Sequence, residues 1–177
     1  SLFSGLMPLE IKNKFPDKWV DEDENEGKNL HEEFFLNENL KRNSIGGKFS
    51  YNKITNLSKG KKLLSNFNNL LQNNLNTIVY NFVDTLSHAR TEMEVIKELA
   101  EDESAYRSLT LSWFKHSPLY EMMKRMSESS SKVFLTTDHG TIRVKNPTKI
   151  MGPKQTNSNM RYKVSKNLSY NKKHVME

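Results

Sequence analysis

Apolar residues recur at helical spacing over much of the chain. This spacing predicts a short helix over residues 30–41 and an amphipathic helix over residues 59–75, the latter despite its many asparagines. A further helical region is predicted from Thr91, where Thr91 and Glu94 have the spacing of a capping box, to about residue 115. The polar residues near Asp102 predict an interruption within it.

Another helix is predicted to begin at Ser117 and Pro118. Serine is a favoured N-cap residue, and proline is favoured in the first turn of a helix. The apolar face of this helix carries Met122, Met123 and Met126. Methionine fills irregular gaps in hydrophobic cores, so the sequence predicts core packing for these residues rather than metal binding.

The spacing changes to nearly continuous apolarity in two segments. Residues 77–83 and 132–137 are rich in β-branched and aromatic residues, and each predicts a buried strand. The strands end at Asp84 and Asp138, and the helices between them make a strand–helix–strand unit. Such units form parallel sheets with helices on their faces, and ligands bind at the carboxyl ends of the strands.

The remaining segments read mainly as loops. Residues 17–29 contain the acidic run DEDENE and predict a solvated loop. Residues 43–58, which contain two glycines and several Asn and Ser, are also predicted to be loop. Residues 141–145 predict one short strand, and the residues after them predict little regular structure.

Composition fits a globular protein, and charge is unevenly distributed. Of the 177 residues, 35% are apolar, and the net charge is +6. No apolar run reaches the roughly 20 residues of a membrane span, so we expect no membrane association. A cytoplasmic location is expected because the chain contains no cysteine. Residues 1–33 hold nine acidic and four basic side chains, whereas residues 141–177 hold nine basic and one acidic. The basic region fits either a solvated surface or a surface that faces phosphate groups or nucleic acid.

The chain contains no cysteine, and it starts without a methionine. The lack of cysteine excludes disulfides and thiolate-bound metal ions. An apolar segment is already under way at Ser1, so we expect a fragment of a longer protein.

Two Asp/His pairs carry the candidate chemistry. Asp84 and His88 are four residues apart, so they share one face if a helical turn follows the strand. Asp138 and His139 are adjacent and can converge on one ion from a turn, for which Gly140 supplies backbone freedom. A carboxylate with an imidazole suits Zn²⁺ or Mn²⁺. The alternatives are a histidine satisfied by hydrogen bonds at a helix start and an aspartate that forms a turn. Because both pairs directly follow predicted buried strands, we favour metal ligands.

The two pairs, each after a strand, resemble the alkaline phosphatase superfamily. The segments SLFSGLMPLEI, NFVDTLSHAR, EDESAYRSLTLSWFKHSPL and TTDHGTIRVKNPTKI more closely resemble the PglZ-type domain of PorX-like response regulators. The resemblance implies a partial alkaline-phosphatase-like α/β fold with a parallel sheet flanked by helices. In that fold, residues 1–177 would be the C-terminal part of one domain, and residues 17–75 would be an insertion of helices and loops.

The resemblance also implies a two-zinc site that hydrolyses phosphate esters of nucleotides or oligonucleotides, with Mn²⁺ as the alternative metal. One ion would be bound by Asp84 and His88, and the other by Asp138 and His139. The nucleophile, a Thr or Ser, and a further Asp would precede Ser1, so the fragment alone is expected to be inactive.

Further site residues are predicted more weakly. The resemblance implies a third ligand of the first metal ion late in the chain, and His174 is the only histidine in that region. Arg161 and Lys163 are candidates for binding substrate phosphate, with surface cations as the alternative. His116 is expected to be a helix cap or a surface residue, and His31 is expected to be exposed.

Three functions stay open on the sequence. The first is a metal-dependent phosphodiesterase or phosphatase, the effector domain of a two-component response regulator. The second is a non-catalytic regulatory domain that controls type IX secretion and whose metal site is structural or binds a nucleotide. The third is a nucleic-acid-binding module, which has little of the expected aromatic interleaving. The resemblance implies a sensor kinase and a sigma factor as partners, and a homodimer is an open alternative.

Overall fold

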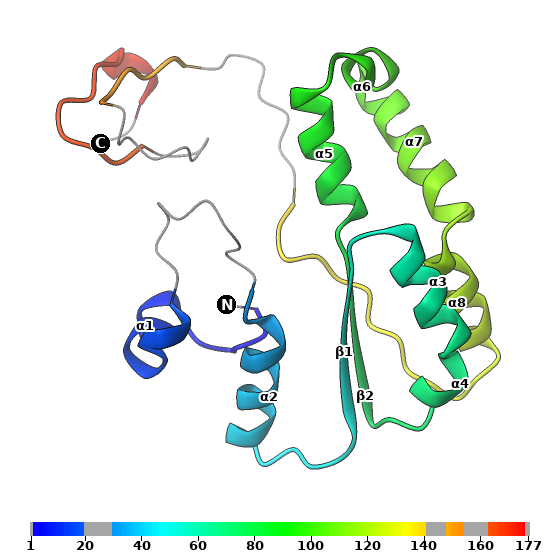
Figure 1. The fold of residues 1–177 in the computed structure, drawn as a ribbon. Coiled ribbons are helices and arrows are strands. Elements are labelled where there is room, and N and C mark those ends of the chain that lie inside the picture. Colours follow the sequence, from blue (N-terminus) through cyan, green and yellow to red (C-terminus); the bar gives the residue numbers. More distant parts are fainter. Residues whose placement is uncertain (1, 20–29, 141–147, 154–162, 176–177) are drawn as a thin grey trace. The chain divides into compact units, whose positions relative to one another are not determined.

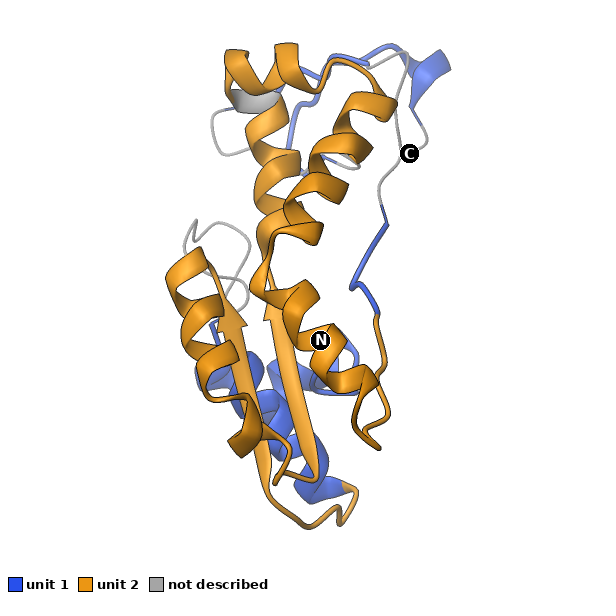
Figure 2. Cartoon of the chain, turned by 90° about the vertical axis from the view of Figure 1, so that its right-hand side faces the viewer, with its two compact units in different colours: residues 1–42, 136–177 blue, residues 43–135 orange. Residues whose placement is uncertain are grey.

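The computed structural model describes residues 2–19, 30–140, 148–153 and 163–175. The chain divides into two compact units (Figure 2). One unit comprises residues 1–42 and 136–177, and the other comprises residues 43–135. Within the described residues, no helix is long and apolar enough to cross a membrane.

Residues 43–135 contain a two-stranded parallel sheet. β1 (Phe49–Ile54) and β2 (Leu75–Tyr80) pair along their whole length. Parallel strands need a crossover connection, and α3 (Leu57–Ser65) with α4 (Phe67–Leu70) provides it. The predicted α/β class, with a parallel sheet flanked by helices, is therefore confirmed (Figure 1).

The predicted strand-forming segments differ from the observed ones. The prediction of loop for residues 43–58 is wrong in part, because β1 lies among them. Side chains alternate between the two faces of this strand, with Phe49, Tyr51 and Lys53 on one face and Ser50, Asn52 and Ile54 on the other. The strand is stabilised by its pairing with β2. β2 ends at Tyr80 rather than at residue 83, because its partner strand ends there. The predicted second strand, residues 132–137, has no regular structure.

The side chains of residues 132–137 explain why that prediction is wrong. Phe134 is 89% exposed and Leu135 is 78% exposed. A strand needs a partner for its backbone groups and a surface for its side chains. Among the described residues, β1 pairs with β2 alone, so this apolar segment has neither.

Four helices follow the sheet in the same unit. They are α5 (Phe82–Glu92), α6 (Glu94–Leu99), α7 (Glu103–Lys115) and α8 (Pro118–Ser127). The predicted interruption is confirmed between α6 and α7, where Asp102 caps α7 by accepting a bond from the Ala105 amide. The predicted helix start at Thr91 is wrong, because α5 continues to Glu92 and α6 has Met93 as its N-cap.

The core of this unit lies between the sheet and α3, α4 and α8 (Figure 1). Met122 of α8 is fully buried and has the largest side chain among the fully buried residues. Around it are the buried residues Ile54, Leu63, Phe67 and Leu70. The methionine-rich face of α8 is thus core, as predicted.

The asparagine-rich segment has a structural role in the turn before β2. The predicted helix over 59–75 is confirmed for α3 and α4, but residues 71–74 turn and Leu75 begins β2. Asn76 accepts bonds from Ser50 Oγ and Asn73 Nδ2, both at 2.7 Å, and donates to the Leu70 carbonyl at 2.7 Å. Its amide therefore joins the turn to β1.

The other unit contains α1 (Pro8–Lys14), a 3-10 turn at Pro16–Lys18, α2 (Glu32–Arg42) and a 3-10 turn at Lys172–His174. The helix predicted over 30–41 is confirmed as α2. The ring of Phe15 contacts the rings of Phe34 and Phe35, with centroids 5.4 and 5.9 Å apart. Met151 and Ser169 form an isolated antiparallel bridge.

Some predictions stay untested by the structure. The acidic run at residues 21–26 and the short strand at residues 141–145 lie outside the described residues. The insertion over residues 17–75 stays a prediction.

Candidate metal centre

Asp84 and His88 lie at the start of α5, just beyond the carboxyl end of β2. The Thr85 amide and hydroxyl both bond to the Asn81 carbonyl, at 2.9 and 2.8 Å, which forms the first helical turn. Because the helix begins this early, Asp84 is within its first turn rather than at a strand end. A carboxylate there interacts favourably with the helix dipole.

The helical spacing brings the two side chains together. Asp84 Oδ1 lies 3.7 Å from His88 Nε2, and the side chains are 56% and 67% exposed. The two side chains therefore lie on the same face of α5, as their four-residue spacing predicts. More than half of each side chain is therefore exposed to solvent.

Contacts from α7 hold α5 in place. The Ser87 and Tyr106 hydroxyls are 2.6 Å apart, so one donates a hydrogen bond to the other. Arg90 Nη1 donates to Glu103 Oε1 at 2.9 Å, and its guanidinium lies 5.2 Å from the centre of the Tyr106 ring. We did not predict these supporting residues, because no local pattern reveals a pairing of residues from separate helices.

Asp138 and His139 lie on an irregular segment of the other unit. Asp138 Oδ1 is 3.8 Å from His139 Nε2, with the side chains 61% and 57% exposed. His139 Nδ1 lies 3.2 Å from the Gly140 carbonyl oxygen. A carbonyl can only accept, so a hydrogen bond at this contact requires a proton on Nδ1.

The geometry of each pair fits half of a metal site. Two donors that bind one zinc ion at about 2.0–2.2 Å lie roughly 3–3.5 Å apart in a tetrahedral arrangement. The observed separations of 3.7 and 3.8 Å are close to this, and the exposed side chains can adjust. A zinc ion usually takes four ligands, so each pair needs further ligands. The described residues contain no group of three or more His, Cys, Asp or Glu side chains suited to a metal ion.

The remaining predicted site residues are spread along the chain. His174 is exposed at the end of a 3-10 turn, and Lys163 is half-buried. Arg161 lies outside the described residues. The metal role of His174 and the phosphate roles of Arg161 and Lys163 stay predictions.

Two histidines were expected to have no ligand role. His116 is the C-cap of α7, and its Nδ1 lies 2.7 Å from the Ser112 carbonyl, which confirms the predicted cap. His31 immediately precedes α2 and is half-buried, although it was expected to be exposed.

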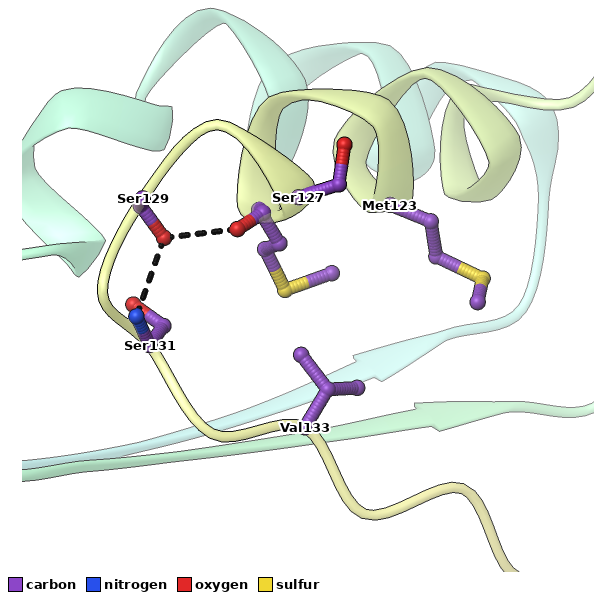
Figure 3. Close-up of a pocket in the computed structure, with 6 residues that line it drawn as sticks. Met123, Ser127, Ser129, Ser131 and Val133 are labelled. Carbon is purple, nitrogen blue, oxygen red and sulfur yellow. Dashed lines mark hydrogen bonds between the residues drawn. The ribbon is translucent and has the colours of Figure 1, made fainter.

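A pocket beside α8 lacks the groups that a metal centre needs. Its volume is about 330 Å³, and it is lined by Met123, Met126, Val133 and three serines (Figure 3). The Ser129 hydroxyl donates to the Met126 carbonyl and accepts from the Ser131 amide, so it is already engaged. Among the described residues, no carboxylate or imidazole lines this pocket, and the Asp/His pairs remain the candidate ligands.

Comparisons with known proteins support one family. A family model described as the BREX system PglZ alkaline phosphatase-like domain matches residues 1–177. A search of curated proteins finds no match.

Proposed function

The chain belongs to the PglZ family of alkaline phosphatase-like domains, and from this membership we propose that it provides ligands of a two-metal site that hydrolyses phosphodiesters or phosphomonoesters of nucleotides or oligonucleotides. Membership itself indicates a phosphoesterase-type function and a phosphate-ester substrate. The observation that carries the finer proposal is the approach of a carboxylate to an imidazole within each Asp/His pair, at 3.7 and 3.8 Å.

Each pair has a defined role in this proposal. Asp84 and His88 would hold one ion, and Asp138 and His139 would hold the other. When bound, divalent ions such as Zn²⁺ or Mn²⁺ polarise the phosphate and stabilise charge on the attacking and leaving oxygens. Donation from His139 Nδ1 to the Gly140 carbonyl would orient the ring so that Nε2 of the neutral imidazole can bind an ion. Solvent exposure of all four side chains leaves access for an extended substrate.

The test measures metal binding and hydrolysis separately in the full-length protein. Zinc and manganese are titrated by calorimetry into the wild type, His88→Ala and His139→Ala. Each variant should bind one ion fewer, or bind it more weakly by more than the roughly 10- to 100-fold that loss of a supporting contact costs. His116→Ala is the matched control, because His116 caps a helix and has no such carboxylate partner among the described residues.

Hydrolysis of bis(p-nitrophenyl) phosphate then distinguishes the two leading functions. Loss of turnover in both ligand variants, but not in His116→Ala, supports the esterase. Metal binding without turnover in the wild type supports the non-catalytic alternative, a regulatory domain whose metal site is structural or binds a nucleotide. Unchanged metal binding in both ligand variants would refute the proposed ligands.

The cellular setting is a separate proposal. The resemblance to PorX-like response regulators supports an effector domain of a two-component system that acts with a sensor kinase and a sigma factor in the control of type IX secretion. Phosphorylation of a receiver domain in the same polypeptide should then change the measured turnover. A polypeptide without a receiver domain would exclude this setting and leave the esterase proposal intact.

A further inference from the structure

Positive and negative charges are separated along the unit formed by residues 43–135. Residues 43–83 contain five lysines and no aspartate, glutamate or arginine. Residues 84–135 contain nine acidic and seven basic side chains. The cationic part comprises β1, α3, α4 and β2. An excess of one sign of charge creates a local potential that attracts ions of the other sign, here anions.

Three of the five lysines lie on α3. They are Lys59, Lys61 and Lys62, which we call the α3 lysines, and all three are exposed. Among the described residues, none of their ammonium groups pairs with a carboxylate. On α5, by contrast, Arg90 Nη1 is paired with Glu103 Oε1 at 2.9 Å. The positive charge of α3 is therefore not neutralised within the described structure.

Lys59 lies in the first turn of α3, where a cation is unfavourable. Asn56 is the N-cap and accepts a hydrogen bond from the Lys59 amide at 3.0 Å. The helix dipole is positive at this end, so carboxylates are favoured there, but the first turn of α3 contains none. Departures from a local rule of this kind are expected at functional positions. A bound anion would interact favourably with both Lys59 and the dipole.

α3 begins at the end of the sheet where the first Asp/His pair lies. Because β1 and β2 are parallel, α3 and α5 both start at the carboxyl ends of the strands (Figure 1). Asn56 and Leu57, at the start of α3, line the same small cavity at the strand ends as Thr85, the neighbour of Asp84. The α3 lysines therefore start beside Asp84 and continue along the helix.

The arrangement of the α3 lysines suits a chain of phosphates. Lys59 and Lys62 are three residues apart and share one face of the helix. Lysine binds phosphate as a point charge, and contacts to a phosphate backbone hold a nucleic acid without reading its sequence. An oligonucleotide carries further phosphates on either side of the one that reacts, whereas a small phosphate monoester carries none.

We propose that the α3 lysines bind the phosphate backbone of a single-stranded oligonucleotide whose reacting phosphate lies at Asp84 and His88. The inference rests on the proposed function for the class of partner and for the position of the reacting phosphate. Binding of the backbone itself requires only the cationic surface. The surface would favour oligonucleotides over small phosphate esters.

The test measures binding of a fluorescein-labelled oligouridylate to the full-length protein by fluorescence anisotropy. The buffer contains EDTA, so binding does not depend on the metal ions. The α3 variant combines Lys59→Gln, Lys61→Gln and Lys62→Gln, and glutamine has a helix propensity close to that of lysine. Circular dichroism and thermal unfolding check that the variant folds.

The salt dependence of binding gives the expected magnitude. Each phosphate contact on a single strand contributes about −0.7 to the slope of log K against log[salt], so loss of three contacts should reduce the slope by about 2. The affinity ratio of wild type to the α3 variant should then fall roughly 20-fold between 50 and 200 mM salt.

A matched control removes the same charge from the other part of the unit. It combines Lys97→Gln, Lys115→Gln and Lys132→Gln, three exposed lysines that lie among the acidic residues. This control should bind the oligonucleotide almost as the wild type does. Equal losses from the two triple variants would show that only net charge matters and would overturn the inference.

The remaining outcomes separate this inference from the proposed function. Binding that weakens in the α3 variant but persists in His88→Ala supports the surface, whether or not the metal proposal holds. Metal binding and turnover of bis(p-nitrophenyl) phosphate, with equal oligonucleotide affinity in wild type and the α3 variant, would overturn the inference and leave the esterase standing. Competition by polyglutamate as effective as that by unlabelled oligonucleotide would also overturn it, because an acidic protein would then fit the surface equally well.

Discussion

Substitution of Met122 by alanine tests the packing that holds α8 on the sheet. Met122 is fully buried against Ile54, Leu63, Phe67 and Leu70. Truncation of a buried methionine removes its transfer free energy and leaves a cavity, which together cost about 2–5 kcal/mol. A unit the size of residues 43–135 has a total stability of roughly 5–14 kcal/mol at 0.05–0.15 kcal/mol per residue. The substitution should therefore remove a large part of it.

The assay is urea and thermal unfolding followed by far-ultraviolet circular dichroism. A domain of this size loses about 4–8 °C of melting temperature per kcal/mol, so a fall of at least 8 °C is expected for Met122→Ala. Met123→Ala is the matched control, because the neighbouring side chain lies at an open pocket and is only half-buried. Equal losses from the two substitutions would refute the packing of α8 through Met122.

Three further predictions concern single polar groups. Ser117→Ala should lower the free energy of unfolding by about 0.5–2 kcal/mol, because the hydroxyl accepts a hydrogen bond from the Tyr120 amide at the N-cap of α8. The control is Ser127→Ala, at the exposed C-terminal end of the same helix. Equal losses of the two variants in urea titrations would contradict the prediction. Tyr106→Phe removes the hydrogen bond to Ser87 and should lower the free energy of unfolding by about 0.5–1.5 kcal/mol. Calorimetry should also find weaker zinc binding at the proposed site of Asp84 and His88, and an unchanged zinc affinity would show that the α5–α7 contact does not support that site. Burial raises the pKa of Tyr80 above its ordinary value of 10.0. As the pH rises, the Tyr80 phenol therefore ionises in the unfolded chain before it does so in the folded chain, and stability should fall above about pH 10. In unfolding titrations from pH 9 to 11, an equal fall of stability in Tyr80→Phe would show that another group is responsible.

Local sequence was sufficient where a structure depends on near neighbours. The cap at Ser117, the helix face of Asp84 and His88 and the buried face of α8 all follow from spacings of three or four residues. These features need no distant partner to be specified, and the structure contains each of them.

Strands were harder to predict, because a strand is defined by its partner. The segment at Phe49–Ile54 contains Ser, Asn and Lys and looks like loop, yet it pairs with β2 over six residues. Residues 132–137 have far stronger strand propensity and form no strand in the described structure. Strand propensity reports how well a side chain fits a half-buried surface, and only the tertiary structure supplies that surface.

The candidate site divides in the same way. The sequence by itself determined the candidate ligands: two aspartates and two histidines, each pair close enough along the chain for one ion. Membership of the family gives these candidates a chemical context. Only the tertiary structure decided that Tyr106 and Glu103 hold α5 in place, and that Tyr80, Phe82 and Trp113 meet around a cavity at the strand ends. Spacing along a chain fixes contacts within one helical turn, whereas contacts between separate elements exist only after those elements have packed.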